Sequence, residues 1–442
     1  MKTIMGVLLL YLSFSAGATK ESLVDISIVK SNEGIWTVTY KTGKPASRLS
    51  FNRNPDASRI PRWRPINPDF EIVLLENKEY LVKKDGSEFE QVSLQLTPTY
   101  KHLAKDYAPF SPYSDGGVLI YTGRLFACID VCDTKVNQWL FSMQIPEGEH
   151  MLVRGEVLTG TASWIDGDDG MNIYVGTQQP VETQNVVAII DRGLPEKIQS
   201  SLNSDIPKLM NYFEQRLGKL EGVKPTLFAS YANIDGHSSQ GGTLSDQIFM
   251  HWNLAKLDKK VKDNTFLNNT LWFFAHEVAH LYQRGSKENS YGKSHEAWLH
   301  EGHAEWLAAL VLLELYPDKQ AYVTTKVDRF KAECGKGLID FPLAQAAAKG
   351  RFDLYYSCGF LIHQAIDQQL REKGEKNIYS LWLEFRNQAE KGNKKDGQKG
   401  SELFLFLTKK WTSSEFASRI KQVVESKLRR PEHTLNQLLT VQ

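Results

Sequence analysis

Apolar and polar residues follow two different periods along the chain, and the change falls near residue 190. Before it they alternate, as at residues 24–29, 35–40 and 171–175, and β-branched and aromatic side chains are frequent. Alternation of this kind is typical of half-buried strands. Turn-forming segments at residues 61–68 and 167–170 separate the runs. The pattern predicts an antiparallel β-domain and favours a sandwich.

In the second part of the chain the apolar period becomes helical. Apolar residues recur three or four positions apart at Ile206, Leu209, Met210, Phe213 and Leu217. Pro195 stands at the expected first helical position and Gly218 after the last, which predicts a helix between them. Residues 225–231 and 248–250 are predicted as strands and residues 240–243 as a turn, and helical patterns then continue to the C-terminus.

Residues 1–18 have the pattern of a secretory signal. Lys2 is followed by an apolar run at residues 4–14 and by Ala-Gly-Ala at residues 16–18, which is typical of a cleavage site. An uncleaved anchor is the alternative, but the run is shorter than the ~20 residues that span a bilayer. We therefore expect cleavage after Ala18, no stable membrane span in the mature chain, and an exported protein that is periplasmic or secreted.

Charge and cysteine content narrow the class of protein further. The formal net charge of the 442 residues is +1, so the chain lacks the excess of positive charge that a nucleic-acid-binding face needs. Its four cysteines fit an oxidising compartment. Pairing of near neighbours would join Cys128 to Cys132 and Cys334 to Cys358, and buried free thiols are the alternative.

The sequence His-Glu-Val-Ala-His at residues 276–280 points to metal chemistry. It lies in a helix-forming run at residues 271–283. His276 and His280 would then lie on one face of the helix, about 6 Å apart along its axis. Two imidazoles so placed can bind one Zn²⁺ ion at about 2.0–2.1 Å. Glu277, rotated by ~100°, can act as a general base on a metal-bound water.

A chance occurrence of this motif on a surface helix is the alternative explanation. The surrounding run, Leu-Trp-Phe-Phe-Ala-His-Glu-Val-Ala-His-Leu-Tyr, is apolar almost all round and so predicts a buried helix. Two histidines and a glutamate in such a helix must be paired or bound to a metal, because unpaired buried polar groups are costly.

A second helix, for which Ser294 is the expected cap, carries the candidates for a third ligand. They are His295, Glu296, His300, Glu301, His303 and Glu305. Its sequence Trp-Leu-His-Glu-Gly-His-Ala at residues 298–304 resembles the W-L-N-E-G-F-A motif of the gluzincin aminopeptidases of the aminopeptidase N type. The resemblance implies that Glu301 is the third zinc ligand. It also implies that Glu305 orients a zinc-bound histidine; a helix-surface glutamate is the alternative for Glu305.

Another motif of that family, Y-x-K-G, has a counterpart at residues 355–359, Tyr-Tyr-Ser-Cys-Gly. The resemblance implies that Tyr356 is the catalytic tyrosine, with Tyr355 as the alternative. A tyrosine hydroxyl there would donate a hydrogen bond to the oxyanion of the tetrahedral intermediate. Cys358 replaces the lysine of the motif.

The family also has a G-x-M-E-N stretch whose glutamate grips the α-amine of the substrate. The chain has Gly-Gly-Thr-Leu at residues 241–244. The glycines suit an edge strand that pairs with a peptide backbone, but Leu244 falls where the glutamate is expected and Asp246 is a possible substitute. Exopeptidase and endopeptidase activity both stay open.

The fold class that we expect is α+β. The strand pattern predicts the N-terminal antiparallel β-domain, and the resemblance, which covers about residues 195–370, implies that a thermolysin-like, mainly helical zinc peptidase domain follows it. We expect a signal at residues 1–18, a β-rich domain at 19–190, a gluzincin-like catalytic domain at 191–375 and a C-terminal helical segment at 376–442. The expected function is that of an exported zinc metallopeptidase with one Zn²⁺ ion and a peptide or protein substrate. The alternative is a non-catalytic exported binding protein with a structural or degenerate zinc site, to which His300 or His303 would give a fourth ligand.

Overall fold

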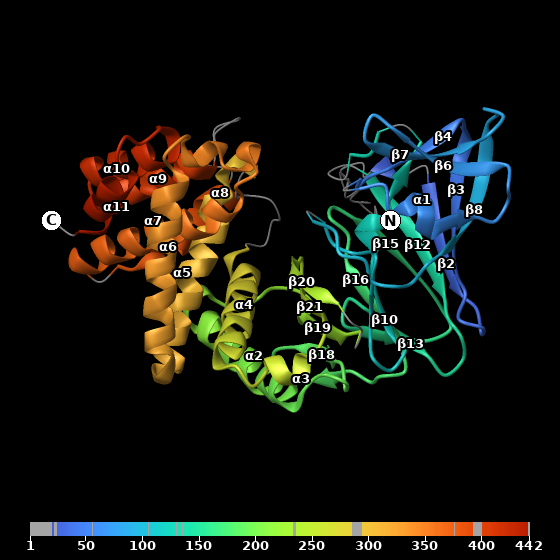
Figure 1. Ribbon diagram of the computed structural model, residues 1–442, viewed down its shortest axis with the longest axis horizontal. Helices are drawn as coiled ribbons and strands as arrows, with labels where there is room; N and C mark the ends of the chain where they lie inside the picture. The colour runs from blue at the N-terminus through green and yellow to red at the C-terminus, as the bar shows by residue number, and fades with distance from the viewer. Residues whose placement is uncertain are drawn as a thin grey trace, which may run out of the picture.

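A sheet-rich part and a helical part lie side by side in the computed structural model, and a smaller sheet with α2 (Glu196–Leu217) and α4 (Asn264–Gln283) lies between them (Figure 1). The structure describes residues 20–21, 24–54, 56–104, 106–129, 131–133, 137–232, 236–284, 294–374, 376–391 and 400–440. The expected signal at residues 1–18 lies outside the described residues.

Three sheets form the N-terminal part. A seven-stranded sheet contains β1 (Lys20–Glu21), β2 (Val24–Lys30), β3 (Trp36–Ala46), β5 (Trp63–Pro65), β8 (Phe89–Leu96), β12 (Asn137–Gln144) and β15 (Thr161–Gly167). A five-stranded sheet contains β9 (Phe110–Pro112), β10 (Val118–Tyr121), β13 (His150–Val153), β14 (Glu156–Leu158) and β16 (Asn172–Gly176). A four-stranded sheet contains β4 (Arg48–Phe51), β6 (Phe70–Leu75), β7 (Lys78–Lys83) and β11 (Ala127–Cys128), and the short helix α1 (Arg59–Arg62) precedes β5.

These three sheets share one apolar core, which the alternation of the sequence predicted. Val24, Ile26 and Ile28 point inward from β2 and are at most 1% exposed, because side chains two apart on a strand lie on one face. Most neighbouring strands are antiparallel, as expected. Strand β12 also runs parallel to β1 and β2, a pairing between distant segments that no hairpin joins and that alternation cannot reveal.

A fourth sheet has the order β17-β18-β19-β21-β20. Its strands are β17 (Val181–Glu182), β18 (Val187–Ile190), β19 (Thr226–Tyr231), β20 (His237–Leu244) and β21 (Gln247–Leu254). It takes strands from both sides of residue 190, where we expected the domain boundary, and the position of that boundary stays a prediction.

Residues 240–243, predicted as a turn, lie instead within the edge strand β20. The prediction of a turn was therefore wrong, whereas the edge strand that the glycines suit is present. The two glycines serve close packing rather than chain reversal. A Cβ atom on Gly241 would lie 2.6 Å from the carbonyl oxygen of Phe249, and one on Gly242 would overlap the hydroxyl of Tyr107. The chain reverses between β20 and β21, where Ser245 has a φ of 31°.

The remaining helices belong mainly to the C-terminal part. They are α3 (Leu257–Lys260), α5 (Trp298–Leu315), α6 (Gln320–Gly337), α7 (Asp353–Glu372), α8 (Ile378–Glu390), α9 (Gly400–Trp411), α10 (Ser414–Glu425) and α11 (Pro431–Leu439). None of the helices in the described ranges is long and apolar enough to cross a membrane.

Helix starts differ from the sequence predictions. Helix α4 begins at Asn264 rather than residue 271, because the side chain of Asp263 accepts a hydrogen bond from the Thr265 amide and caps the helix. Ser294 starts a separate 3₁₀ turn, and Ala297 rather than Ser294 precedes α5. Pro195, expected at the first helical position, lies instead at the N-cap of α2, which begins at Glu196. Of these three starts, that of α4 has a side-chain cap, whereas the residues that precede α2 and α5 make no capping hydrogen bond through their side chains.

Candidate metal centre

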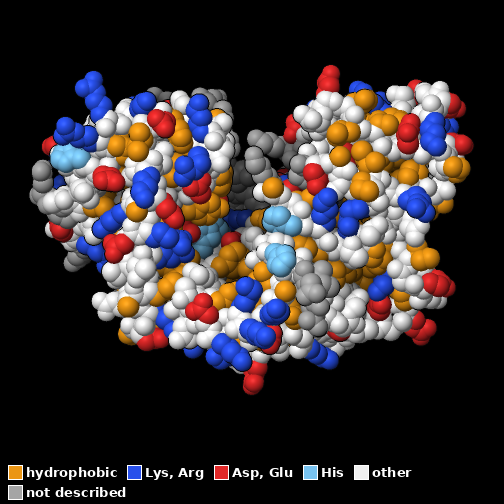
Figure 2. Space-filling model, in the orientation of Figure 1, with side chains coloured by type: hydrophobic (Ala, Val, Ile, Leu, Met, Phe, Trp, Pro, Cys, Tyr) orange, Lys and Arg blue, Asp and Glu red, His pale blue; other side chains and the backbone are white. Residues whose placement is uncertain are grey.

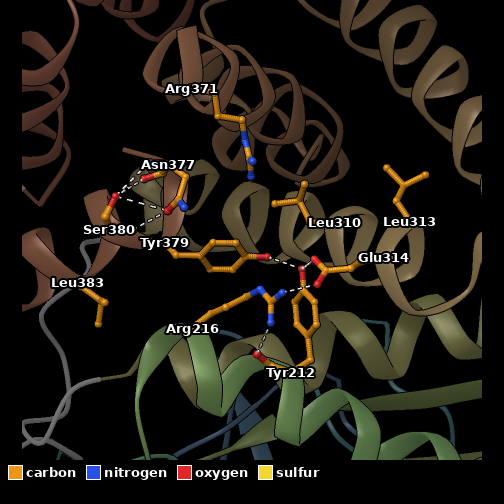
Figure 3. A pocket seen from close by; sticks show the side chains of 10 residues that line it. All are labelled: Tyr212, Arg216, Leu310, Leu313, Glu314, Arg371, Asn377, Tyr379, Ser380 and Leu383. Atoms are coloured by element: carbon orange, nitrogen blue, oxygen red, sulfur yellow. Dashed lines mark hydrogen bonds and ion pairs between the residues drawn. The ribbon is translucent and has the colours of Figure 1, made fainter. Parts of the chain in front are cut away.

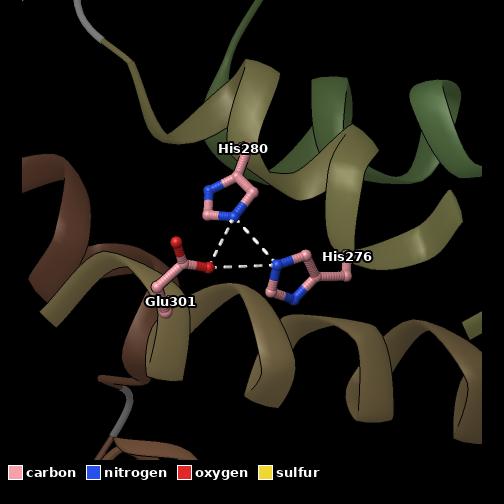
Figure 4. A group of neighbouring side chains, drawn as sticks. All are labelled: His276, His280 and Glu301. Carbon is pink, nitrogen blue, oxygen red and sulfur yellow. Dashed lines mark hydrogen bonds and ion pairs between the residues drawn. The ribbon is translucent and has the colours of Figure 1, made fainter. Parts of the chain in front are cut away.

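His276 and His280 of α4 and Glu301 of α5 point their side chains at one another (Figure 4). Each residue offers one ligand atom, and these atoms all lie within 4.8 Å of one another. The Nε2 atoms of the two histidines are 2.9 Å apart. The Oε2 atom of Glu301 lies 3.3 Å from Nε2 of His276 and 3.2 Å from Nε2 of His280. The three predicted metal ligands therefore form one triangle.

This triangle fits a zinc ion. Ligands at 2.0–2.2 Å around a tetrahedral ion are about 3.3–3.6 Å apart, close to the sides of the triangle. Burial disfavours the charged form of His276, yet the hydrogen bond to Glu301 and the charges of nearby carboxylates raise its pKa to about 9. The surrounding groups therefore stabilise positive charge at this point, which a bound Zn²⁺ ion would supply.

Further side chains lie next to the Nδ1 atoms of the two histidines, and the one beside His280 is a hydrogen-bond partner. The Nδ1 atom of His276 lies 3.7 Å from Oε1 of Glu305, and the indole of Trp272 donates a hydrogen bond to the other carboxylate oxygen of Glu305. The Nδ1 atom of His280 lies 2.8 Å from Oε1 of Gln283. Contacts on Nδ1 leave Nε2 of each ring directed at the triangle.

Glu277 lies beside the triangle, and the hydroxyl of Thr243 on β20 holds it. The Thr243 Oγ1 atom is 2.7 Å from Oε2 of Glu277 and 3.0 Å from its backbone oxygen. The carboxylate is close enough to His276 and Tyr356 to raise the pKa of both. The sequence interpretation did not include Thr243, because its partner is 34 residues away along the chain.

The structure places the two neighbouring tyrosines of α7 differently. The ring of Tyr356 lies 5.7 Å from that of His276. Burial and the carboxylates of Glu301 and Glu277 raise the pKa of Tyr356 above its ordinary value, so its hydroxyl keeps its proton. Tyr355 is fully buried, and its hydroxyl contacts the backbone at Ala347 and Ala344. Tyr356 is therefore the tyrosine that faces the site.

Two disulfide bonds are present, Cys128–Cys132 and Cys334–Cys358. The second joins α6 to α7 two residues after Tyr356. Cys358 is thus a cross-link at the position where the resembling motif has lysine.

The N-terminal part supplies one wall of a cavity of about 550 Å³ beside β20. The lining comes from Arg53, Leu103, Ala104, Asp106, Tyr107 and Asp169 on one side and from Ser239, Gln240, Gly241, Thr243 and Leu244 on the other. In the space-filling view a hollow separates the sheet-rich part from the helical part, and histidine side chains lie along this hollow (Figure 2).

Tyr107 is the aromatic residue of this wall that lies close to the metal site. Burial and the carboxylates of Glu277 and Glu301 raise its pKa above the ordinary value. The backbone amide of Ala108 donates a 3.2 Å hydrogen bond to Gln240 on β20, which joins the two walls. The sequence interpretation missed Tyr107, since no local pattern links it to α4.

Several candidate residues lie away from the triangle. His303 is fully buried and stacks on Trp382 with ring centroids 3.9 Å apart. The carboxylate of Glu296 accepts hydrogen bonds from Ser401 at the start of α9. Asp246 lines a different cavity with Arg154 and Lys224. His300 is closer, with Nε2 3.4 Å from Oε1 of Glu301.

Another cavity, of about 670 Å³, opens among α2, α5, α7 and α8. Its polar groups bind one another, since the hydroxyls of Tyr212 and Tyr379 are 2.9 Å apart and Arg216 pairs with Glu314 (Figure 3). None of the predicted site residues lines it.

No protein-family model and no curated protein sequence matches the chain. Solved structures do match. An aminopeptidase N family protein from Idiomarina loihiensis has a TM-score of 0.64 and 11% identity, over 94% of this chain and 78% of that one. An M1 zinc metallopeptidase from Deinococcus radiodurans, bound to a Tyr-Ser-Ala substrate, has a TM-score of 0.53 and 13% identity, over 93% and 95%. Yeast LTA4 hydrolase in complex with bestatin has a TM-score of 0.53 and 14% identity, over 94% and 68%.

These likenesses define the fold. The chain has the architecture of the M1 zinc metallopeptidases, a sheet-rich N-terminal part followed by a helical part. They confirm the predicted fold class and, at the level of the fold, the resemblance to the gluzincin aminopeptidases.

Proposed function

We propose that the protein is a zinc-dependent metallopeptidase that hydrolyses peptide bonds. The observation that carries the proposal is the triangle of His276, His280 and Glu301, with Glu277 and Tyr356 beside it. A peptide substrate is supported by the Deinococcus structure, whose ligand is a tripeptide.

His276, His280 and Glu301 would hold one Zn²⁺ ion. When bound, the ion lowers the pKa of a coordinated water toward about 7 and polarises the scissile carbonyl. Glu277 takes a proton from the attacking water and returns it to the leaving amine. The Thr243 hydroxyl donates to one carboxylate oxygen of Glu277 and so fixes the direction of the other. Tyr356, which keeps its proton, donates to the oxyanion.

We propose that the peptide lies along β20. This strand is at the end of its sheet and pairs with β21 on one side, so its other edge can pair with an extended backbone. Gly241 lies on this strand and lines the cavity, and Gly242 is the next residue along the strand. Leu244, at the place of the family's amine-binding glutamate, is buried with Phe249 in an apolar cluster and offers no charge to an α-amine.

A structural zinc site would need a fourth protein ligand. His303, one of the two candidates, has Nδ1 2.8 Å from the side-chain nitrogen of Gln283 and is stacked on Trp382. Within the described ranges, the group that could hold a metal consists of His276, His280 and Glu301. This favours a site with an open position, as a catalytic zinc needs.

We also propose that the protein is exported. The pattern at residues 1–18 supports the proposal, and so do the two disulfide bonds, which are typical of oxidising compartments.

The test is cleavage of a peptide library by the zinc-loaded protein, with metal content measured in parallel. We expect cleavage that a chelator abolishes and added zinc restores. Glu277→Gln should keep its zinc and lose at least ~100-fold in kcat, while Glu314→Gln, in the other cavity, should keep both. Zinc-loaded wild-type protein that cleaves no peptide would overturn the proposal, and normal cleavage by Glu277→Gln would remove the assigned base. The cleavage sites also distinguish exopeptidase from endopeptidase activity.

A further inference from the structure

Gln283 is the last residue of α4 and is 2% exposed. Its side-chain amide makes three contacts. The Oε1 atom lies 2.8 Å from Nδ1 of His280. The Nε2 atom donates to the backbone oxygen of His300 at 2.8 Å and lies 2.8 Å from Nδ1 of His303. This one amide thus links both helices that carry metal ligands.

The contacts fix which way the amide points. The backbone oxygen of His300 can only accept a hydrogen bond, so it must face the nitrogen of the Gln283 amide. The amide oxygen must then face His280, and because that oxygen can only accept, Nδ1 of His280 carries the hydrogen. In a neutral imidazole, the form that binds a metal, the nitrogen without a hydrogen is then Nε2. This atom lies 2.9 Å from Nε2 of His276 and 3.2 Å from Oε2 of Glu301.

Helix α8 holds Gln283 in place. The last carbonyl groups of a helix have no hydrogen-bond partner within the helix. The indole nitrogen of Trp382 donates a 3.0 Å hydrogen bond to the backbone carbonyl oxygen of Gln283. The ring of the same tryptophan stacks on His303, with 13° between the ring planes. Arg386, one turn further along α8, donates to the backbone oxygens of Tyr282 and Arg284.

We propose that Gln283 is a positioning residue for the metal ligand His280, and that Trp382 of α8 holds Gln283 for this purpose. The inference rests on the proposed zinc site. It gives a role to α8, the first helix of the C-terminal segment at residues 376–442. The sequence alone assigned no role to this segment. Partners on the second nitrogen of a metal-bound histidine commonly change metal affinity by ten- to a hundredfold.

The test is zinc affinity, measured by competition with a chromophoric chelator, together with the thermal unfolding of the metal-free proteins. Gln283→Met removes all three side-chain contacts at nearly constant volume. Gln283→Glu keeps an oxygen that accepts from His280 but loses both donors. Gln247→Met is the matched control, because Gln247 is also buried and makes two hydrogen bonds, to the backbone of Asn172.

We expect the zinc dissociation constant to rise by about ten- to a hundredfold in Gln283→Met and to stay unchanged in Gln247→Met. Gln283→Glu should bind zinc more tightly than Gln283→Met, because it keeps an oxygen that accepts from His280. Its metal-free form should nevertheless unfold at a lower temperature than that of Gln283→Met, since its carboxylate faces two acceptors, the backbone oxygen of His300 and Nδ1 of His303. Trp382→Phe, which keeps the stacked ring but loses the donor, should weaken zinc binding by a smaller factor.

A merely structural role predicts that zinc affinity follows thermal stability. Equal zinc affinity in Gln283→Met and Gln247→Met would overturn the inference, and so would weaker binding in Gln283→Glu than in Gln283→Met. The measurement needs no turnover. A wild-type protein that binds zinc and cleaves no peptide would therefore remove the proposed function and leave this inference standing.

Discussion

Gly302 of α5 and Gly359 of α7 pack backbone against backbone. A Cβ atom on Gly359 would lie 2.7 Å from the Cα of Gly302 and 2.7 Å from the carbonyl oxygen of Trp298. Gly302 directly follows Glu301, and Gly359 lies about one turn after Tyr356. The contact therefore sets how closely the helix that carries Glu301 approaches the helix that carries Tyr356.

Replacing Gly302 by alanine should push these helices apart. We expect the free energy of unfolding to fall by about 1–3 kcal/mol, as for other overpacked cores, and zinc binding to weaken. Chemical denaturation and chelator competition measure the two effects. The control is Gly167→Ala, where a new Cβ would meet no atom closer than 3.4 Å. Unchanged zinc affinity in Gly302→Ala would contradict the importance of the contact for the site.

Removing the hydroxyl of Tyr356 should affect catalysis alone. Tyr356→Phe loses the donor to the oxyanion, and we expect kcat to fall by about 10²–10³-fold with zinc content and KM little changed. Tyr355→Phe is the matched control, because the Tyr355 hydroxyl contacts the backbone of Ala344 in η4 (Leu343–Gln345) and of Ala347 in η5 (Ala347–Lys349) and does not face the site. It should lose stability and keep kcat. The reverse result would show that the two assignments are exchanged.

The hydroxyl of Thr243 should matter for the rate rather than for binding. Thr243→Val keeps the shape of the side chain but frees the carboxylate of Glu277, and we expect a fall in kcat of about tenfold, as for the loss of one hydrogen bond to a charged group. Thr243→Ser should restore most of the rate. Steady-state kinetics on a peptide found in the library would check this, and a serine variant as slow as the valine variant would argue against it.

Asp166 on β15 gives a prediction about pH. Burial raises its pKa from the ordinary 3.8 to about 6. Between these two values the folded protein keeps a proton that the unfolded chain releases, so stability falls as pH rises from about 4 to 6 and stays lower above. Asp166→Asn should therefore be more stable than the wild type at pH 8, by up to about 3 kcal/mol.

The advantage of Asp166→Asn should shrink as the pH falls toward 4, and unfolding curves at pH 4.5 and pH 8 measure it. Asp115→Asn is the control, because Asp115 accepts a comparable hydrogen bond from Gly117 but is exposed. An advantage that does not change with pH would mean that the charge of Asp166 is not the cause.

That His276 and His280 lie together could be predicted because their geometry is local: helical spacing places both on one face of α4. Glu301 lies on another helix, and its candidacy came from the resemblance of its motif to that of the gluzincin aminopeptidases. Gln283 was also within reach, because it lies three residues after His280 and residues so spaced are neighbours on a helix.

Tertiary contacts that join distant segments could not be predicted in this way. Thr243 meets Glu277 only because β20 packs beside α4, and Tyr107 reaches the site only because the N-terminal part closes over the same strand. The glycines of β20 fit both a turn and an edge strand in the sequence, since a sequence does not show which side chains approach a backbone.

The cavity beside β20 has a consequence for how selectivity can change. The residues proposed to hold the metal come from α4 and α5, whereas Leu103, Asp106 and Tyr107 come from a connecting segment of the N-terminal part. Substitutions in that segment would change the shape and charge of the cavity without changing the residues of these two helices. If the proposed function holds, variants with new substrate preferences can be sought by randomising this one loop.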